Sequence, residues 1–282
     1  MNTISPAPLN IQALLKRFGI RPSKGLGQNF LIDDSILQNI VTIAGVGRQD
    51  TVLEIGPGLG SLTRYLALVA GNVVAVELDQ KLFPVLETTL QSFHNVHLIR
   101  GDILELELKN LVSDEGYLLV ANIPYYITSA ILRHILESTP KPRKIVLTVQ
   151  KEIAERICAE KKLSLLAVSV QVYGRPSIEL QIPAKAFFPS PQVDSAVVQI
   201  EISPTPLINP EQLEPFFDIV RAGFSQKRKT LRNSLSAGLH IPAAEAQQLL
   251  EFVEINPQRR AETLTINEWS KLTEYYLDRK IC

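Results

Sequence analysis

The chain contains little cysteine and no long apolar run. Cys158 and Cys282 are its only cysteines, and their wide separation indicates neither a disulfide framework nor a zinc site. No apolar stretch reaches the roughly 18 residues of a transmembrane helix, and the N-terminus lacks the apolar core of a secretory signal. These absences predict a cytoplasmic protein with no membrane partner.

The chain also lacks a net charge, because 29 basic residues balance 29 acidic ones. The charge is unevenly placed, however. Residues 1–32 carry basic residues and no acid, which is typical of a basic arm or of a transit peptide. A second stretch without acids lies between Asp218 and Glu245. Local potential steers phosphate binding even on a neutral protein, so the basic residues of this second stretch are candidates for nucleic-acid binding. The alternative is that they are solvated surface charge. These residues are Arg221, Lys227, Arg228, Lys229 and Arg232.

Short β-type runs alternate with helical segments over the first 200 or so residues. The predicted strands are Thr51–Ile55, Val73–Glu77, Val96–Arg100, Leu118–Ala121, Ile145–Gln150, Ser177–Ile182 and Ser195–Ile202. The predicted helices are 11–18, 34–44, 61–70, 80–91, 128–138 and 151–159. Such alternation indicates βαβ units and an α/β, Rossmann-like sheet of seven mostly parallel strands. The last two strands have no clear helix between them, which fits an antiparallel pair at the edge.

The proline-rich segment Ser203–Pro210 is the clearest linker in the chain, because its prolines interrupt both helices and strands. Beyond it the pattern is wholly helical, with predicted helices at 211–224, 227–238, 243–252 and 267–279. We therefore expect two domains, an α/β domain over 1–203 and a small all-helical domain over 211–282.

A glycine-rich turn follows the first predicted strand of the sheet. Gly56-Pro57-Gly58-Leu59-Gly60 allows a tight turn and a close approach of backbone to ligand. Glu77 ends the next strand at the offset expected for an acid that binds ribose hydroxyls, and Asp102 follows the third strand. The pattern departs from the dinucleotide fingerprint, and Pro57 removes an N–H that a pyrophosphate would use. The turn therefore favours a ligand such as S-adenosylmethionine over NAD.

Asn122-Ile123-Pro124-Tyr125 ends the fourth predicted strand, at the edge of the sheet where open α/β folds bind ligands. An amide oxygen beside an aromatic ring suits an amino group on a flat heterocycle such as adenine. An ordinary strand-to-helix turn is the simpler alternative, since Asn and Pro are frequent turn residues. The four histidines show no metal-ligand spacing, so no metal is expected.

These motifs, in this order, resemble the KsgA-type adenine dimethyltransferases of small-subunit ribosomal RNA, in their bacterial branch. The resemblance covers nearly the whole chain. It extends to 23–31, 150–152, 187–197, 224–232 and 257–264 as well as to the glycine turn, Glu77 and Asn122–Tyr125. One departure is a short segment after 151–160, where Lys161-Lys162 runs directly into Leu163-Ser164-Leu165.

The resemblance implies an enzyme that uses S-adenosylmethionine to dimethylate two adjacent adenines in 16S rRNA, with an immature small subunit as partner. It implies that the cofactor is bound by Asn29, Leu31, Gly56, Gly58, Glu77, Asp102 and Asn122. It also implies that the Asn122–Tyr125 segment is catalytic and that Tyr125 and Phe187 sandwich the target adenine. A monomer is the default expectation.

Two rival functions remain open on the sequence. An Erm-type methyltransferase acting on large-subunit rRNA would share the cofactor motifs, but the motifs at 224–232 and 257–264 argue against it. An assembly factor would bind the small subunit as its main task and methylate it only secondarily.

Overall fold

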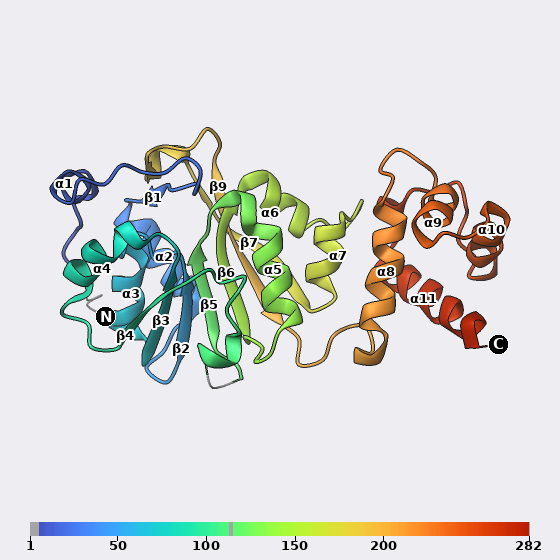
Figure 1. Ribbon diagram of the computed structural model, residues 1–282, viewed down its shortest axis with the longest axis horizontal. Coiled ribbons are helices and arrows are strands. Elements are labelled where there is room, and N and C mark those ends of the chain that lie inside the picture. Colours follow the sequence, from blue (N-terminus) through green and yellow to red (C-terminus); the bar gives the residue numbers. More distant parts are fainter. Residues whose placement is uncertain (1–5, 113–114, 282) are drawn as a thin grey trace. The chain divides into compact units, whose positions relative to one another are not determined.

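The computed structural model describes residues 6–112 and 115–281 (Figure 1). Cys282 lies outside them. The chain divides into two compact units. The first contains the sequence up to Glu155 together with Arg175–Ile202, and the second contains Arg156–Gly174 together with the sequence from Ser203 onward. The second unit thus takes in a segment that precedes the predicted linker.

The first unit is built on a seven-stranded sheet in the order β4-β3-β2-β5-β6-β9-β7. Parallel pairing joins β4, β3, β2, β5 and β6, and β9 runs antiparallel to β6. The predicted seven-stranded Rossmann-like sheet is therefore confirmed, with its last two strands as neighbours at one edge. Its strands are β2 (Thr51–Ile55), β3 (Asn72–Glu77), β4 (Val96–Arg100), β5 (Leu118–Asn122), β6 (Lys144–Gln150), β7 (Gly174–Ile182) and β9 (Ser195–Ile202).

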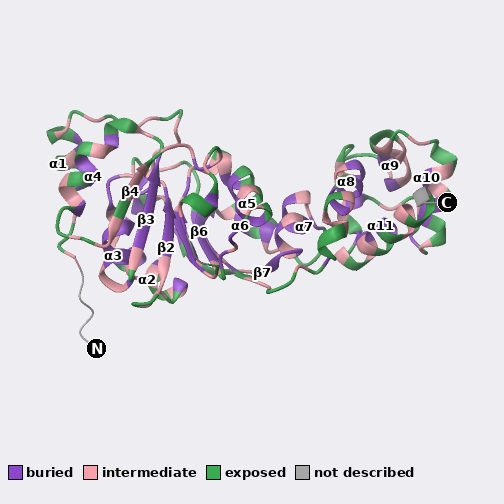
Figure 2. Cartoon of the chain, turned by 60° about the horizontal axis from the view of Figure 1, so that its bottom comes forward, coloured by how far each residue is buried: buried purple, intermediate pink, exposed green. Residues whose placement is uncertain are grey.

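The central strands consist mostly of apolar residues, because helices cover both faces of a parallel sheet. Figure 2 shows β2, β3 and β6 as buried, and Val52, Leu119 and Ile145 have no exposed surface. At the sheet's edges, β4 and β7 carry exposed positions instead. The sheet thus forms the rigid core from which the ends of β2, β3 and β5 project.

The helices of the first unit follow the strands much as predicted. They are α1 (Ile11–Arg17), α2 (Asp34–Ala44), α3 (Ser61–Val69), α4 (Phe83–Leu90, after the 3-10 turn η1, Gln80–Leu82) and α5 (Thr128–Glu137), and α6 (Lys151–Ile157) leads into the second unit. Asp33 caps α2 by accepting from the amides of Ser35 and Ile36. An unpredicted small sheet pairs β1 (Phe30–Leu31) with β8 (Phe187–Phe188) in antiparallel register.

The second unit is helical, with α7 (Leu165–Gln171), α8 (Leu213–Phe224), α9 (Leu231–Leu239), α10 (Ala243–Phe252) and α11 (Ile266–Ile281). Its core contains the fully buried Trp269. A Cβ at Gly223 would lie 2.3 Å from the Trp269 ring, so glycine is required where α8 approaches α11. No described helix is long and apolar enough to span a membrane.

Two details of the second unit differ from the sequence prediction. The helix predicted over 227–238 begins only at Leu231, because the amides of Leu231 and Arg232 bond to the carbonyls of Arg259 and Pro257. The predicted linker is also anchored: the amides of Ser203 and Leu207 donate to the carbonyls of Tyr173 and Val172.

Candidate active site

A pocket opens in the first unit where the sheet order reverses, at the carboxyl ends of β2 and β5. Ligands of open α/β sheets bind at this switch point. The pocket brings together every candidate of the first unit except Phe187: Asn29, Leu31, Gly56, Gly58, Glu77, Asp102, Asn122, Ile123, Pro124 and Tyr125.

The glycine turn after β2 lines the pocket. Gly58 has a φ of 62°, and a Cβ there would lie 3.1 Å from the Phe30 ring. Its amide donates to Glu77 Oε2 over 3.1 Å. Glycine is needed at this position both for the left-handed backbone and for the close approach of β1.

Glu77 at the end of β3 holds two turns at once. Its Oε1 accepts from the Asp79 amide over 2.8 Å, while its Oε2 accepts from Gly58. The residue is only 6% exposed, and burial raises the pKa of its carboxyl despite these two amide donors. Each carboxylate oxygen still has a second lone pair that a hydroxyl of a ligand would reach.

Asp102 follows β4 and forms part of the pocket wall. Its Oδ1 accepts from the Leu104 amide over 3.0 Å, which closes the turn after Gly101. Asp102 therefore caps this turn. The cap uses one carboxylate oxygen and is compatible with ligand binding through Oδ2.

The segment before α2, which contains Gln28 and Asn29, is held at the pocket by hydrogen bonds of side-chain amides. Gln28 accepts from the Ser23 amide and donates to Asp79 Oδ2, each over 2.8 Å. Asn122 Nδ2 donates to the Asn29 carbonyl over 3.2 Å. Because the Asn122 amide nitrogen is used in this way, its Oδ1 is left as the acceptor on the other side of the group.

The two aromatic candidates lie in different surroundings. Tyr125 begins the 3-10 turn η3 (Tyr125–Ile127) at the pocket wall, and its hydroxyl lies 2.6 Å from Ser195 Oγ. Phe187 is 3% exposed and packs in the hydrophobic core with Leu31 and Val197. The sandwich of a base between both rings therefore stays a prediction, since only Tyr125 lines the pocket in this structure.

Glu54 is a pocket residue that the sequence reasoning passed over. It is 1% exposed on β2, and its Oε2 has no hydrogen-bond partner among the described residues. Burial, with a smaller contribution from the nearby Glu77, raises the pKa of this carboxyl to about 8. An acid two residues before Gly56, in an otherwise apolar part of the strand, was the available signal.

We expect this carboxyl to make the free protein less stable as the pH rises. The unfolded chain releases the Glu54 proton near pH 4.5, whereas the folded chain keeps it up to about pH 8. The free energy of unfolding must therefore fall across that window. Thermal unfolding at several pH values should show a shallower fall for Glu54→Gln. The exposed Glu87→Gln should retain the wild-type slope, and equal slopes for both variants would contradict a neutral Glu54.

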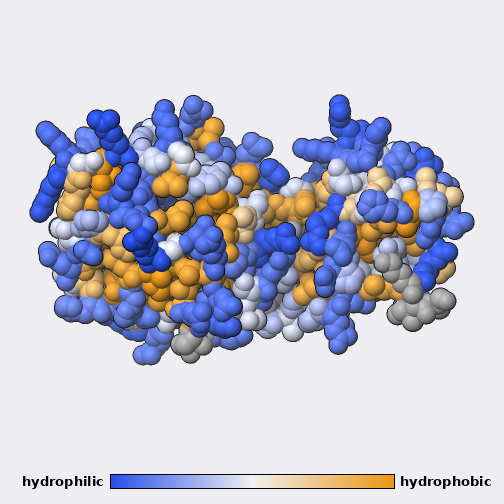
Figure 3. Space-filling view, in the orientation of Figure 1, coloured by the Kyte–Doolittle hydropathy of each residue, from blue (hydrophilic) through white to orange (hydrophobic). Residues whose placement is uncertain are grey.

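The basic candidates of the second unit fall into two groups. Arg221 pairs with Asp218 over 2.7 Å, and Arg232 donates to Asn233 and Gln247. The stretch 227–229 is exposed in the connection between α8 and α9, where Figure 3 shows hydrophilic side chains.

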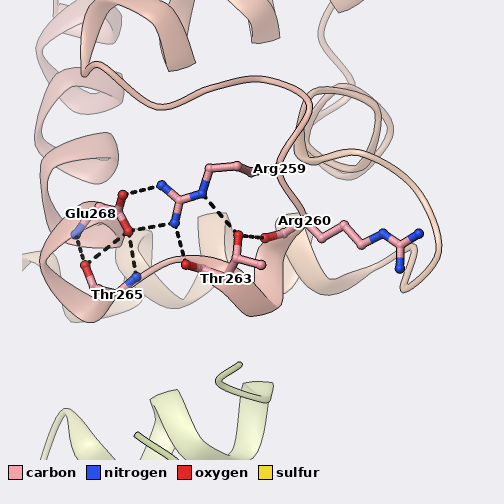
Figure 4. Close-up of polar contacts among 5 residues, drawn as sticks. All are labelled: Arg259, Arg260, Thr263, Thr265 and Glu268. Carbon is pink, nitrogen blue, oxygen red and sulfur yellow. Dashed lines mark hydrogen bonds and ion pairs between the residues drawn. The ribbon is translucent and has the colours of Figure 1, made fainter. Parts of the chain in front are cut away.

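The neighbouring pair Arg259-Arg260 also divides. Figure 4 shows Arg259 turned toward Glu268, with which it forms an ion pair, and also bonded to Thr263. Glu268 in turn caps α11 by accepting from the Thr265 amide over 2.8 Å. Arg260 extends away from this network. Arg259 therefore stabilises the helical unit, and Arg260 is the member of the pair that is open to solvent.

The Rossmann-like sheet, the glycine turn with its following acid, and the Asn-Ile-Pro-Tyr segment define a nucleotide-type methyltransferase site. The chain belongs to the ribosomal RNA adenine dimethylase family, whose model matches residues 20–278. It is 44% identical over 265 residues to the ribosomal RNA small subunit methyltransferase A of Dehalococcoides mccartyi (strain CBDB1), covering 93% of this chain and 91% of that protein.

Solved structures agree on the fold. The 23S rRNA methyltransferase ErmE is 27% identical with a TM-score of 0.69, covering 88% of this chain and 99% of that one. A dimethyladenosine transferase from Plasmodium falciparum has a TM-score of 0.76 at 24% identity, covering 89% of this chain and 98% of that one.

Proposed function

We propose that this protein transfers methyl groups from S-adenosylmethionine to the N6 atoms of two adjacent adenines near the 3′ end of 16S rRNA. We further propose that it acts as a monomer on the immature small subunit. The observation that carries the proposal is Asn122, whose amide is oriented by the Asn29 carbonyl so that Oδ1 serves as the acceptor in the pocket. Similarity to small-subunit methyltransferase A supports the choice of substrate.

The pocket fits an S-adenosylmethionine molecule on several counts. The glycine turn admits a ligand close to its backbone, Glu77 and Asp102 offer carboxylate oxygens for hydroxyl and amino groups, and Glu54 Oε2 is a buried acceptor without a partner among the described residues. A bound S-adenosylmethionine supplies an electrophilic methyl group on a cationic sulfur. The carboxylate forms of Glu77 and Asp102 suit that positive charge.

The Asn122–Tyr125 segment would activate the adenine amino group for methyl transfer. The amino nitrogen of adenine is a weak nucleophile, because its lone pair is delocalised into the ring. Acceptors at Asn122 Oδ1 and the Ile123 carbonyl would bind its two hydrogens and favour a pyramidal nitrogen with a free lone pair. Pro124 fixes the backbone that carries them. Catalysis then consists chiefly of positioning.

Stacking supplies the second part of recognition. An adenine taken out of its RNA stack needs a flat partner, and a base on an aromatic ring gains about 1–3 kcal/mol. The half-buried Tyr125 is placed at the pocket wall for this role. We propose Phe187 as the ring for the opposite face, which requires a rearrangement from its buried position.

Mapping methyladenines by mass spectrometry tests the proposal directly. Small subunits incubated with this protein and S-adenosylmethionine should gain dimethyladenines at two neighbouring positions, and large subunits should gain none. The large-subunit control is needed because the Erm-type fold is so similar. Methylation of large subunits alone would replace the proposal with the Erm-type activity.

The surface formed by Lys227, Arg228 and Lys229 is proposed to hold the subunit through its phosphates. Arg228→Glu with Lys229→Glu should weaken small-subunit binding severalfold and reduce the salt dependence of the binding constant. The matched control is Lys109→Glu with Lys271→Glu, which changes the net charge equally at other exposed positions. If both pairs weakened small-subunit binding equally, the effect would come from the net charge of the protein and not from a specific binding surface.

A role in subunit assembly would use the same surface independently of methyl transfer. An Asn122→Ala variant that still binds immature small subunits and supports their maturation would show this second role. Sedimentation profiles of subunits matured with that variant and with the charge-reversed pair would separate binding from catalysis.

A further inference from the structure

The contact between Tyr125 and Ser195 joins two distant parts of the first unit. The Tyr125 hydroxyl and Ser195 Oγ lie 2.6 Å apart, although 70 residues separate them in sequence. Tyr125 ends the Asn122–Tyr125 segment, whereas Ser195 begins strand β9. Ser195 has no exposed surface and does not line the pocket. Its hydroxyl can therefore affect the pocket only indirectly, through its contact with Tyr125.

Ser195 is itself held in place by the sheet. It pairs with Gln150 in the antiparallel ladder between β6 and β9. The preceding residue, Asp194, accepts from the Lys151 amide through its carbonyl and from the Ala184 amide through Oδ1. The backbone that carries the serine hydroxyl is thus held by hydrogen bonds on both sides.

The tyrosine is held at both ends. The Thr128 hydroxyl donates to its carbonyl over 3.1 Å, and Ser195 holds the far end of its ring. The neighbouring Tyr126 is 62% exposed, in contrast to the half-buried Tyr125. Burial raises the pKa of the Tyr125 phenol, and the Ser195 hydrogen bond opposes this rise only in part, so the ring is neutral at physiological pH. It serves as a fixed, uncharged platform.

We infer that Ser195 is a positioning residue for methyl transfer, which fixes the direction in which the Tyr125 ring points before the target adenine arrives. The inference rests on the proposed function. A ring already fixed in the free enzyme loses little freedom when a base stacks on it, so binding energy is retained for the transition state. Without the serine hydroxyl, the ring would sample other rotamers and the adenine amino group would meet Asn122 less often.

The expected result is a loss in rate without a loss in cofactor binding. Ser195→Ala should slow single-turnover methylation of small subunits roughly two- to tenfold, the span of one neutral hydrogen bond. The KM for subunits and the calorimetric affinity for S-adenosylmethionine should hardly change. Tyr125→Phe keeps the ring but removes its hydroxyl and should match this loss, and the double variant should be no slower than either single one.

Matched controls separate positioning from general stability. Ser195→Thr keeps a hydroxyl and should restore much of the rate. Thr148→Val removes a buried hydroxyl from β6 that has no partner among the described residues, and it should leave the rate unchanged. Full activity of Ser195→Ala or Tyr125→Phe would overturn the inference, as would multiplicative losses in the double variant. If the wild-type protein itself methylated no small-subunit adenines, the proposed function would fail instead.

Discussion

Asn122→Asp is expected to abolish most methyl transfer while changing the size of the side chain hardly at all. The substitution replaces the Nδ2 donor by an oxygen that faces the Asn29 carbonyl, where two acceptors repel each other. The oriented acceptor for the adenine amino group is then lost. By analogy with the removal of one preorganised hydrogen-bonding group, we expect the single-turnover rate to fall about 10²–10³-fold.

The measurement pairs this rate with binding of S-adenosylmethionine by calorimetry. Asn122→Ala should lose a similar factor, and both variants should lose far less in cofactor affinity than in rate. Asn110→Asp makes the same chemical change at an exposed position and serves as the control. A wild-type rate for Asn122→Asp would show that the amide does not activate the adenine nitrogen.

Several of the site residues that the sequence predicted stand at the ends of strands in the main sheet, whereas Asn29 and Leu31 were predicted from the family resemblance alone. Gly56, Glu77, Asp102 and Asn122 each stand at or directly after an apolar strand, and parallel strands bring their carboxyl ends to one edge. Periodicity was therefore enough to bring them into one pocket. The local motifs, namely the glycine-rich turn and the Asn-Ile-Pro-Tyr segment, then indicated which residues at those strand ends bind a ligand.

The parts that were missed depend on pairing between distant segments. Phe30 pairs with Phe188 in the small sheet, and the Tyr125 hydroxyl contacts Ser195. Neither contact produces a recognisable pattern in the sequence around these residues. The burial of Phe187 follows from that same small sheet, and its role beside the base stays a prediction. Helix α7 was missed because its valines resemble a strand, although Ser164 caps it by accepting from the Ala167 amide.

Glu77→Gln is expected to weaken S-adenosylmethionine binding about 10²-fold. The carboxylate accepts from two amides, those of Gly58 and Asp79, one on each oxygen. A glutamine keeps only one acceptor oxygen, so its NH₂ group must face one of these N–H donors, and that hydrogen bond is lost. Either the glycine turn or the turn after β3 is then no longer held by this side chain. Hydrogen bonds to a charged group are worth about 1.5–3 kcal/mol each, so the loss of one from the turn that lines the pocket, together with a weaker contact to the ribose that we propose Glu77 binds, is expected to give this factor.

Calorimetric titration with S-adenosylmethionine measures this loss, and thermal unfolding checks that the variant is folded. Because burial raises the pKa of Glu77, its protonated form is favoured as the pH falls, and protonation should mimic the substitution. Wild-type affinity should therefore decline in acid, while Glu77→Gln should bind weakly with a flatter pH profile. Glu87→Gln on the exposed face of α4 should retain both the affinity and the decline. Wild-type affinity in Glu77→Gln would mean that the cofactor is bound without this carboxylate and that the glycine turn does not depend on it.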